Sequence, residues 1–155
     1  MTDRRRLPDP LAALQRLPPG SAVIARETDA VRRAALVRLL RPLCRRRGLR
    51  LLVAADEGLS RTVDGLHLPE ATVRHGPRRW RRFRRPAALV TAAAHAPAAI
   101  WRAAAQGVHA ILLSPVFATA SHPGAVPLGP IRLARMVRAS PLPVYALGGI
   151  DTASA

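Results

Sequence analysis

The sequence alternates between short runs of apolar residues and longer stretches in which apolar residues recur at helical spacing. The short runs are apolar at consecutive positions, which is typical of strands buried on both faces of a parallel sheet. They begin roughly 15 to 35 residues apart, which leaves room for a helix between successive strands, as in βαβ units. We expect strands at residues 21–26, 49–55, 65–68, 87–91, 109–114 and 143–147. Helices are expected from 31 to a stop near Gly48, at 71–85 with an interruption near residues 76–77, and at 98–106 and 131–139.

Two architectures accommodate this alternation: a doubly wound sheet and a (β/α)₈ barrel. No Gly-x-Gly-x-x-Gly follows the first expected strand, which argues against a nucleotide-binding sheet. Asp151 and Thr152 form a good helix cap, but only three residues follow them. A barrel needs about 200 residues or more, and the chain has 155. We therefore expect a single α/β domain over residues 1–155, shorter than a complete barrel.

The composition predicts a folded protein outside the membrane. Apolar residues make up 49% of the chain, which is typical of a packed core and not of disorder. No apolar run approaches the ~20 residues that span a bilayer, and no secretory signal follows the N-terminal charges. The single cysteine, Cys44, cannot form an internal disulfide and is expected in the core. A reduced, cytoplasmic setting follows.

The chain is strongly basic, with a formal net charge of +16, and every basic residue other than histidine is an arginine. Without lysine, no side chain can form a Schiff base. Arginines cluster at 45–47 and 78–85, where Trp80 and Phe83 lie three residues apart. These clusters are either solvated helix faces or a patch for nucleic acid or anionic lipid. Aromatic residues are only 3% of the chain, which disfavours base stacking and a nucleic-acid partner.

Two expected strands end in segments suited to a small anion. The strand at 109–114 is followed by Pro-Val-Phe-Ala-Thr-Ala-Ser-His-Pro-Gly, in which Thr119 and Ser121 offer hydroxyl groups. The strand at 143–147 is followed by Gly148 and Gly149, whose backbone N–H groups can approach a phosphate closely. Such strand-end loops hold ligands in α/β proteins, so we expect a phosphate-sized ligand here.

These two segments, together with Gly-Leu-His-Leu at 65–68 and Thr-Ala-Ala-Ala-His at 91–95, resemble the thiamine-phosphate synthase and TenI family. The order and spacing of the motifs agree over residues 17–150. The resemblance implies an α/β fold of the TIM (β/α)₈ type, incomplete at the C-terminus of this chain. It also implies a transferase of thiamine biosynthesis, which joins a hydroxymethylpyrimidine diphosphate to a thiazole phosphate while Mg²⁺ neutralises the leaving pyrophosphate. The expected partners are these small phosphorylated substrates. The resemblance leaves open whether the protein forms a homo-oligomer.

The resemblance transfers the family's functional residues only in part. Arg26 matches the arginine of the family's Gln-Leu-Arg-x-Lys motif, but Ile24 replaces its glutamine and Thr28 its lysine. The Asn-Asp-Arg motif falls on residues 54–56, so its metal-binding aspartate becomes an alanine unless Asp56 takes its place.

The next motif, His-Leu-Gly-Gln-x-Asp, becomes His67-Leu-Pro-Glu-Ala-Thr, without the final aspartate. Asp56 and Glu70 are therefore the remaining candidate ligands for Mg²⁺, which prefers oxygen donors.

The resemblance leaves the activity open among related functions. His95, His122 and Arg26 are candidate catalytic residues, and the candidates for binding substrate and phosphate are Thr119, Ser121, His122, Gly148, Gly149 and His67. The chain either couples the two substrates or, as a degenerate relative, only binds thiazole or thiamine phosphate. Thiazole tautomerases of the TenI branch carry a catalytic histidine where this chain has Pro115. The remaining alternative is a non-catalytic basic protein that binds nucleic acid or anionic lipid.

Overall fold

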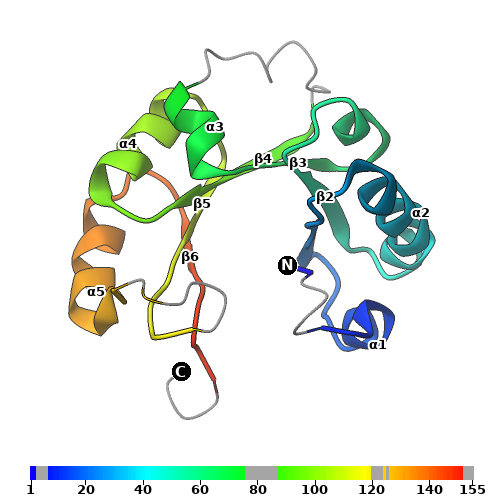
Figure 1. Ribbon diagram of the computed structural model, residues 1–155, viewed down its shortest axis with the longest axis horizontal. Coiled ribbons are helices and arrows are strands. Elements are labelled where there is room, and N and C mark those ends of the chain that lie inside the picture. The colour runs from blue at the N-terminus through cyan, green and yellow to red at the C-terminus, as the bar shows by residue number, and fades with distance from the viewer. Residues whose placement is uncertain (3–6, 76–86, 120–123, 125, 152–155) are drawn as a thin grey trace. The chain divides into compact units, whose positions relative to one another are not determined.

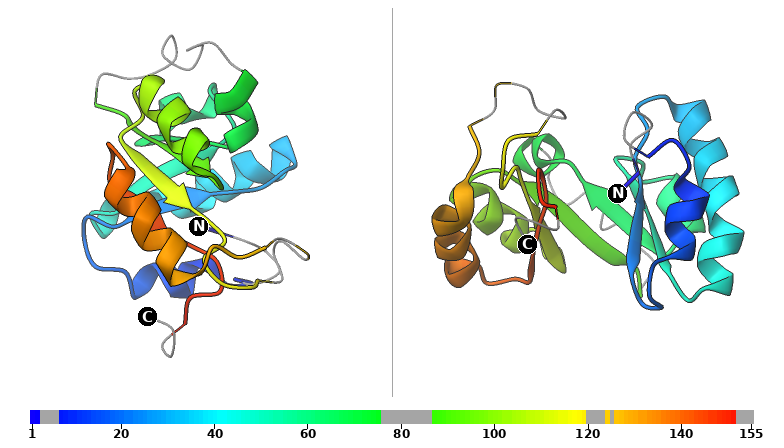
Figure 2. Two further views of the ribbon diagram at one scale, coloured as in Figure 1. Left: turned by 90° about the vertical axis from the view of Figure 1, so that its left-hand side faces the viewer. Right: turned by 90° about the horizontal axis from the view of Figure 1, so that it is seen from below.

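The computed structural model describes residues 1–2, 7–75, 87–119, 124 and 126–151. These residues form two compact units, which we describe separately (Figures 1 and 2). The first unit holds α1, β1, α2, β2, η1 and most of β3, together with Leu89 and Val90. The second holds α3, the rest of β4, α4, β5, α5 and β6. The expectation of a single domain stays a prediction.

In the first unit, two aspartates begin the helices that flank the strands. The Asp9 carboxylate accepts hydrogen bonds from the amides of Leu11 and Ala12, and the Asp29 carboxylate accepts one from Arg32. Side-chain oxygens at this position satisfy amides that the first helical turn leaves without partners. The elements are α1 (Pro10–Gln15), β1 (Ala22–Ala25), α2 (Ala30–Arg46), β2 (Arg50–Ala54), the 3₁₀ turn η1 (Leu59–Thr62) and β3 (Gly65–Leu68).

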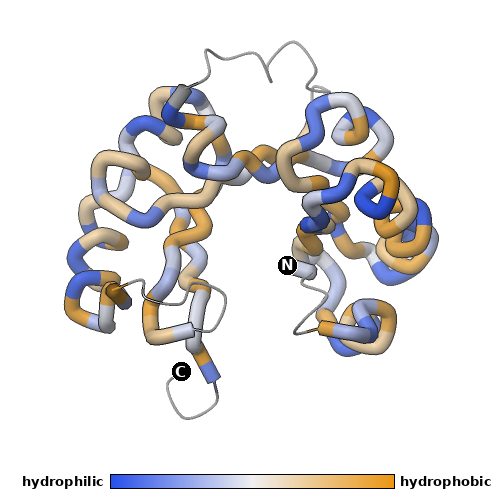
Figure 3. Tube along the Cα trace, viewed as in Figure 1, coloured by the Kyte–Doolittle hydropathy of each residue, from blue (hydrophilic) through white to orange (hydrophobic). Residues whose placement is uncertain are grey.

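The strands of the first unit pair in parallel around an apolar core. Val23 lies beside Leu51, and Val53 lies beside Leu66. Helix α2 alternates between hydrophobic and hydrophilic residues along its length (Figure 3) and buries Val37, Leu40 and Cys44. Cys44 is therefore a core residue, as expected, and burial raises the pKa of its thiol, with a smaller effect from the charge of Asp64.

The second unit repeats the strand–helix alternation. Its elements are α3 (Glu70–His75), β4 (Leu89–Ala94), α4 (Pro97–Ala105), β5 (Ala110–Leu113), α5 (Gly129–Ala139) and β6 (Val144–Ala146). Strands β4, β5 and β6 pair in parallel, with Ala92 beside Ile111 and Leu112 beside Tyr145. All residues of β5 are buried, whereas Tyr145 in β6 is 62% exposed.

The described elements confirm the expected alternation, with bounds that differ by a few residues and with the following larger differences. Strand β4 covers Leu89–Ala94 and not residues 87–91: the Leu89 amide donates to the Asp64 carbonyl oxygen, and the pairing with β5 continues to Ala94 beside Leu113. Helix α1 and turn η1 were not expected, since both are too short to show helical periodicity. Helix α3 reaches His75, and the rest of the stretch expected as helix lies outside the described residues.

The first arginine cluster ends helix α2, where Arg45 and Arg46 are exposed and the guanidinium of Arg47 donates to the Leu17 carbonyl oxygen at 3.1 Å. The second cluster, with Trp80 and Phe83, lies outside the described residues. Within the described ranges, no helix combines the length and the apolar character needed to cross a membrane.

Candidate functional site

In the second unit, the loop after β5 and the end of β6 are joined by backbone hydrogen bonds. The amide of Val116 donates to the Leu147 carbonyl oxygen and the amide of Phe117 to that of Gly148, both at 2.9 Å. We refer to residues 114–119 as the β5 loop. The two segments singled out in the sequence therefore lie side by side, as expected of the carboxyl ends of neighbouring parallel strands.

The Gly-Gly pair is required by this close approach. Gly148 and Gly149 have φ values of +93° and +70°, a region that L side chains rarely adopt. A Cβ at Gly149 would lie 2.6 Å from the Ala118 carbonyl oxygen and 2.7 Å from the Cβ of Phe117. Any side chain here would therefore push the β5 loop away from β6.

The same pair leaves backbone donors for an anion. Within the part of the chain that the structure describes, the amides of Gly149 and Ile150 donate no hydrogen bond. Thr119, which is half-buried, ends the described part of the β5 loop. Ser121 and His122 lie outside the described residues. Backbone amides and a hydroxyl group at a strand end are the groups that bind a phosphate in many proteins.

A second cluster links helix α3 to the ends of β4 and β5. The Glu70 carboxylate accepts a hydrogen bond from the His95 amide at 2.9 Å and lies 3.6 Å from an Arg102 guanidinium nitrogen. The His95 Nδ1 lies 2.6 Å from the Ser114 carbonyl oxygen, at the first residue of the β5 loop. The sequence suggested Glu70, His95 and the motif that begins at Ser114, but it gave no sign of Arg102, because that contact depends on how α3 and α4 pack.

In the first unit, Asp56 lies just after β2 and is held by Arg33 of α2. The Asp56 carboxylate accepts from Arg33 Nε at 3.1 Å and from the Leu59 amide at 2.8 Å. The same guanidinium donates to the carbonyl oxygens of Glu27 and Thr28, which follow β1. Sequence reasoning missed Arg33, which lies within an ordinary helical pattern.

His67 and Arg26 also belong to the first unit. His67 is only 5% exposed, and burial lowers the pKa of its imidazole to about 4, with smaller contributions from the charges of Arg26 and the Met1 amino group. The ring is therefore neutral at neutral pH and can act as a hydrogen-bonding group, not as a cation that binds phosphate. The amide of Arg26 donates to the Thr2 hydroxyl oxygen at 2.9 Å, while its side chain is exposed.

The candidate metal ligands do not fit a Mg²⁺ site. Each oxygen of Asp56 and of Glu70 already faces a guanidinium or accepts from an amide. A hard cation needs several oxygen donors that are not neutralised by arginine. In addition, no group of three or more His, Cys, Asp or Glu side chains in the described residues is arranged to hold a metal ion.

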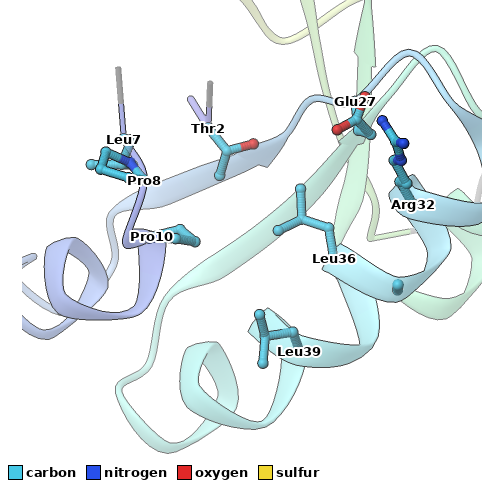
Figure 4. Close-up of a pocket in the computed structure, with 9 residues that line it drawn as sticks. Thr2, Leu7, Pro8, Pro10, Glu27, Arg32, Leu36 and Leu39 are labelled. Atoms are coloured by element: carbon cyan, nitrogen blue, oxygen red, sulfur yellow. The ribbon is translucent and has the colours of Figure 1, made fainter. Parts of the chain in front are cut away.

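A pocket of about 350 Å³ lies elsewhere in the first unit, between the segment before α1 and helix α2 (Figure 4). Leu7 and Pro8 line one side of it, and Leu36 and Leu39 line the other. Its lining is mainly apolar and includes none of the candidate residues from the sequence. It is therefore separate from the predicted phosphate site.

The order of these motifs agrees with a family model described as thiamine monophosphate synthase (TMP-TENI), which matches residues 8–155. The chain belongs to the thiamine monophosphate synthase family. The resemblance seen in the sequence is thus confirmed.

Named relatives agree with this assignment. A thiamine-phosphate synthase from Deinococcus radiodurans is 35% identical over 121 residues, which cover 76% of this chain and 42% of that protein. Another, from Methanoculleus marisnigri, is 36% identical over 100 residues, which cover 64% of this chain and 46% of that protein. The chain therefore spans less than half the length of these two relatives.

A solved structure supports the fold. Thiamine phosphate pyrophosphorylase from Pyrococcus furiosus matches 95% of this chain and 72% of its own with a TM-score of 0.75, at 20% sequence identity. This likeness confirms the expected α/β fold of the barrel type. The matched residues correspond to only part of the solved barrel.

Proposed function

We propose that this chain acts in thiamine biosynthesis as a protein of the thiamine-phosphate synthase type. In this proposal, its second unit binds the phosphate of a thiazole phosphate or of thiamine phosphate. The observation that carries the proposal is the β5 loop packed against Gly148 and Gly149, next to which the amides of Gly149 and Ile150 donate no hydrogen bond within the described residues. The family assignment and the named relatives support the same pathway.

The physical basis is a site made largely of backbone. The amides of Gly149 and Ile150 carry partial positive charge and need no rearrangement to receive an oxyanion. Thr119 is a candidate for a further hydroxyl donor. The net charge of +16 raises the local concentration of anionic ligands around any such site.

The reaction we propose is the coupling of hydroxymethylpyrimidine diphosphate to thiazole phosphate, with release of pyrophosphate. Arg26, His95 and His122 stay candidates for contact with the substrates. No step is assigned to Mg²⁺, because the contacts of Asp56 and Glu70 do not suit that ion.

Calorimetric titration tests the binding proposal. Thiamine phosphate is expected to bind measurably, and thiamine without its phosphate is the matched control and is expected to bind at least about tenfold more weakly, because charge-assisted hydrogen bonds to the phosphate are lost. Equal affinity for the two ligands, or no heat with either, would contradict a phosphate site.

A coupling assay then separates an enzyme from a relative that only binds. The protein is mixed with both substrates and Mg²⁺, and thiamine phosphate is measured by chromatography. Formation of product supports the synthase reaction. Binding without product reduces the chain to a carrier of the phosphorylated ligand.

The relatives favour this function over the alternatives. The two that we name are thiamine-phosphate synthases, and neither is named as a tautomerase. Pro115 occupies the position of the tautomerase histidine, and it is buried beside Gly148. For nucleic acid or lipid binding, the arginine cluster at the end of α2 is exposed, but the second cluster lies outside the described residues.

A further inference from the structure

Glu70 connects two helices and a strand of the second unit. It is the first residue of α3, and its Oε2 accepts from the amide of His95, just beyond β4, at 2.9 Å. Its Oε1 lies 3.6 Å from Nη2 of Arg102, which comes from α4. Helices α3 and α4 pack against each other (Figure 1), so the carboxylate lies between elements that meet only in the folded chain.

The contact continues from His95 to the β5 loop. A carbonyl oxygen can only accept a hydrogen bond, so the 2.6 Å distance from His95 Nδ1 to the Ser114 oxygen requires the proton on Nδ1. Ser114 begins the β5 loop. Two and three residues further along this loop, the amides of Val116 and Phe117 donate to the carbonyl oxygens of Leu147 and Gly148. A continuous series of contacts therefore runs from Glu70 through His95 to the Gly-Gly pair.

We propose that Glu70 is a positioning residue, not a metal ligand: through His95 and Ser114 it fixes the β5 loop in the arrangement that receives the ligand phosphate. The ligand part of this inference rests on the proposed function. The inference goes beyond the proposed function because it assigns the carboxylate a role that needs no divalent cation.

The surroundings of Arg102 explain why the charge of Glu70 matters. The Arg102 Nε is buried and has no hydrogen-bond partner among the described residues, and the ion pair with Glu70 is the one that those residues provide. Removing the carboxylate leaves a partly buried guanidinium without a nearby anion and the His95 amide without its acceptor. Both losses are expected to loosen the end of β4 and, with it, the support of Ser114.

The first experiment compares variants with and without metal. Thiamine phosphate is titrated into the wild type, Glu70→Ala and Glu70→Gln, in Mg²⁺ and again in EDTA. Glu70→Ala is expected to weaken binding by about tenfold in both buffers, because a charge-assisted hydrogen bond is lost. Glu70→Gln, which keeps an oxygen for the His95 amide, is expected to lose less. Glu57→Gln, with the same change of charge in the first unit, is the control and is expected to bind as the wild type does.

A metal ligand would behave differently. If the defect of the Glu70 variants appears only in Mg²⁺ and disappears in EDTA, the positioning role is overturned. The same conclusion follows if both variants bind as tightly as the wild type.

A second measurement does not depend on the ligand. Amide hydrogen exchange is followed at His95 in the wild type and the variants, and Glu70→Ala is expected to lose protection there, while Glu70→Gln keeps most of it. Unchanged protection in Glu70→Ala overturns the inference. If the wild type binds no thiamine phosphate, the proposed function fails, and the exchange data still decide whether Glu70 holds His95. If Glu70→Ala does not fold, Glu70→Gln provides both readouts.

Discussion

The two units differ in the polar groups that lie at the ends of their strands. In the first unit, side chains bond to one another: Arg33 reaches Asp56 and two carbonyl oxygens, and buried His67 stays neutral. In the second unit, the end of β6 is bare glycine backbone, with amides that face no partner in the described residues. The side-chain contacts there, from Glu70 to Ser114, lie beside this backbone.

This difference supports the proposal that the ligand phosphate binds in the second unit. Polar side chains that satisfy one another stabilise the fold but have little capacity left for a substrate. Backbone amides at a glycine pair are not covered by a side chain, so they can still bind an anion. The family's motifs are kept in the second unit, at the β5 loop and the Gly-Gly pair. Its other motifs are substituted at Ile24, Thr28, Ala55 and Thr72, of which the first three lie in the first unit.

The largest expected effect concerns a glycine that serves packing in the first unit. A Cβ at Gly65 would overlap the backbone carbonyl of Leu89, which cannot move aside like a flexible side chain. Gly65→Ala is therefore expected to lower the free energy of unfolding by about 3 to 5 kcal/mol, measured by urea denaturation. Gly58→Ala is the control: its φ is −65° and its nearest atom is 3.6 Å away. A Gly65→Ala protein as stable as the control would contradict the close approach.

The next effect is the pH dependence of the first unit. His67 has a pKa near 4 when folded and near 6.5 when unfolded, so the unfolded chain binds the additional proton as the pH falls between these values. Stability is expected to be complete above about pH 6.5 and to fall by about 3 kcal/mol as the pH approaches 4. His67→Gln should flatten this part of the curve, whereas His109→Gln, at an exposed histidine, should not. Equal curves for the wild type and His67→Gln would show that His67 is not the titrating group.

A smaller effect is expected at the candidate phosphate site. Gly149→Ala meets both a positive φ and the contacts with Ala118 and Phe117, so it should cost about 2 kcal/mol of stability and weaken binding of thiamine phosphate by about tenfold. Gly129→Ala has nearly the same φ, +69°, but nothing lies within 4 Å of its Cβ. It should lose only about 1 kcal/mol and bind normally. Identical losses in the two variants would remove the reason for assigning Gly149 to the site.

The smallest effect concerns Ala55, which follows β2 and has a φ of +57°. Asparagine tolerates this conformation better than alanine, so Ala55→Asn is expected to stabilise the protein by about 0.5 to 1 kcal/mol in denaturant titrations. Ala55→Val is the opposing variant, because a β-branched residue at positive φ is strained, and it should destabilise. The reverse order of the two variants would show that the strain does not exist.

The sequence alone was enough for the alternation of strands and helices and for the family. Runs of consecutive apolar residues mark buried parallel strands without reference to the rest of the chain, as in β2 and β5. The motif from Ser114 to Gly124 and the Gly-Gly pair are local in sequence, so they identified the family, and the site expected at them stays a prediction.

The tertiary structure decided what the polar residues do. Asp56 and Glu70 looked alike in the sequence, as carboxylates near strand ends and candidates for Mg²⁺. Only packing brought Arg33 to the first and Arg102 to the second, from positions 23 and 32 residues away along the chain. Whether a carboxylate can bind a metal ion or forms an ion pair depends on which cation lies beside it in the folded chain. No local sequence pattern predicts that neighbour.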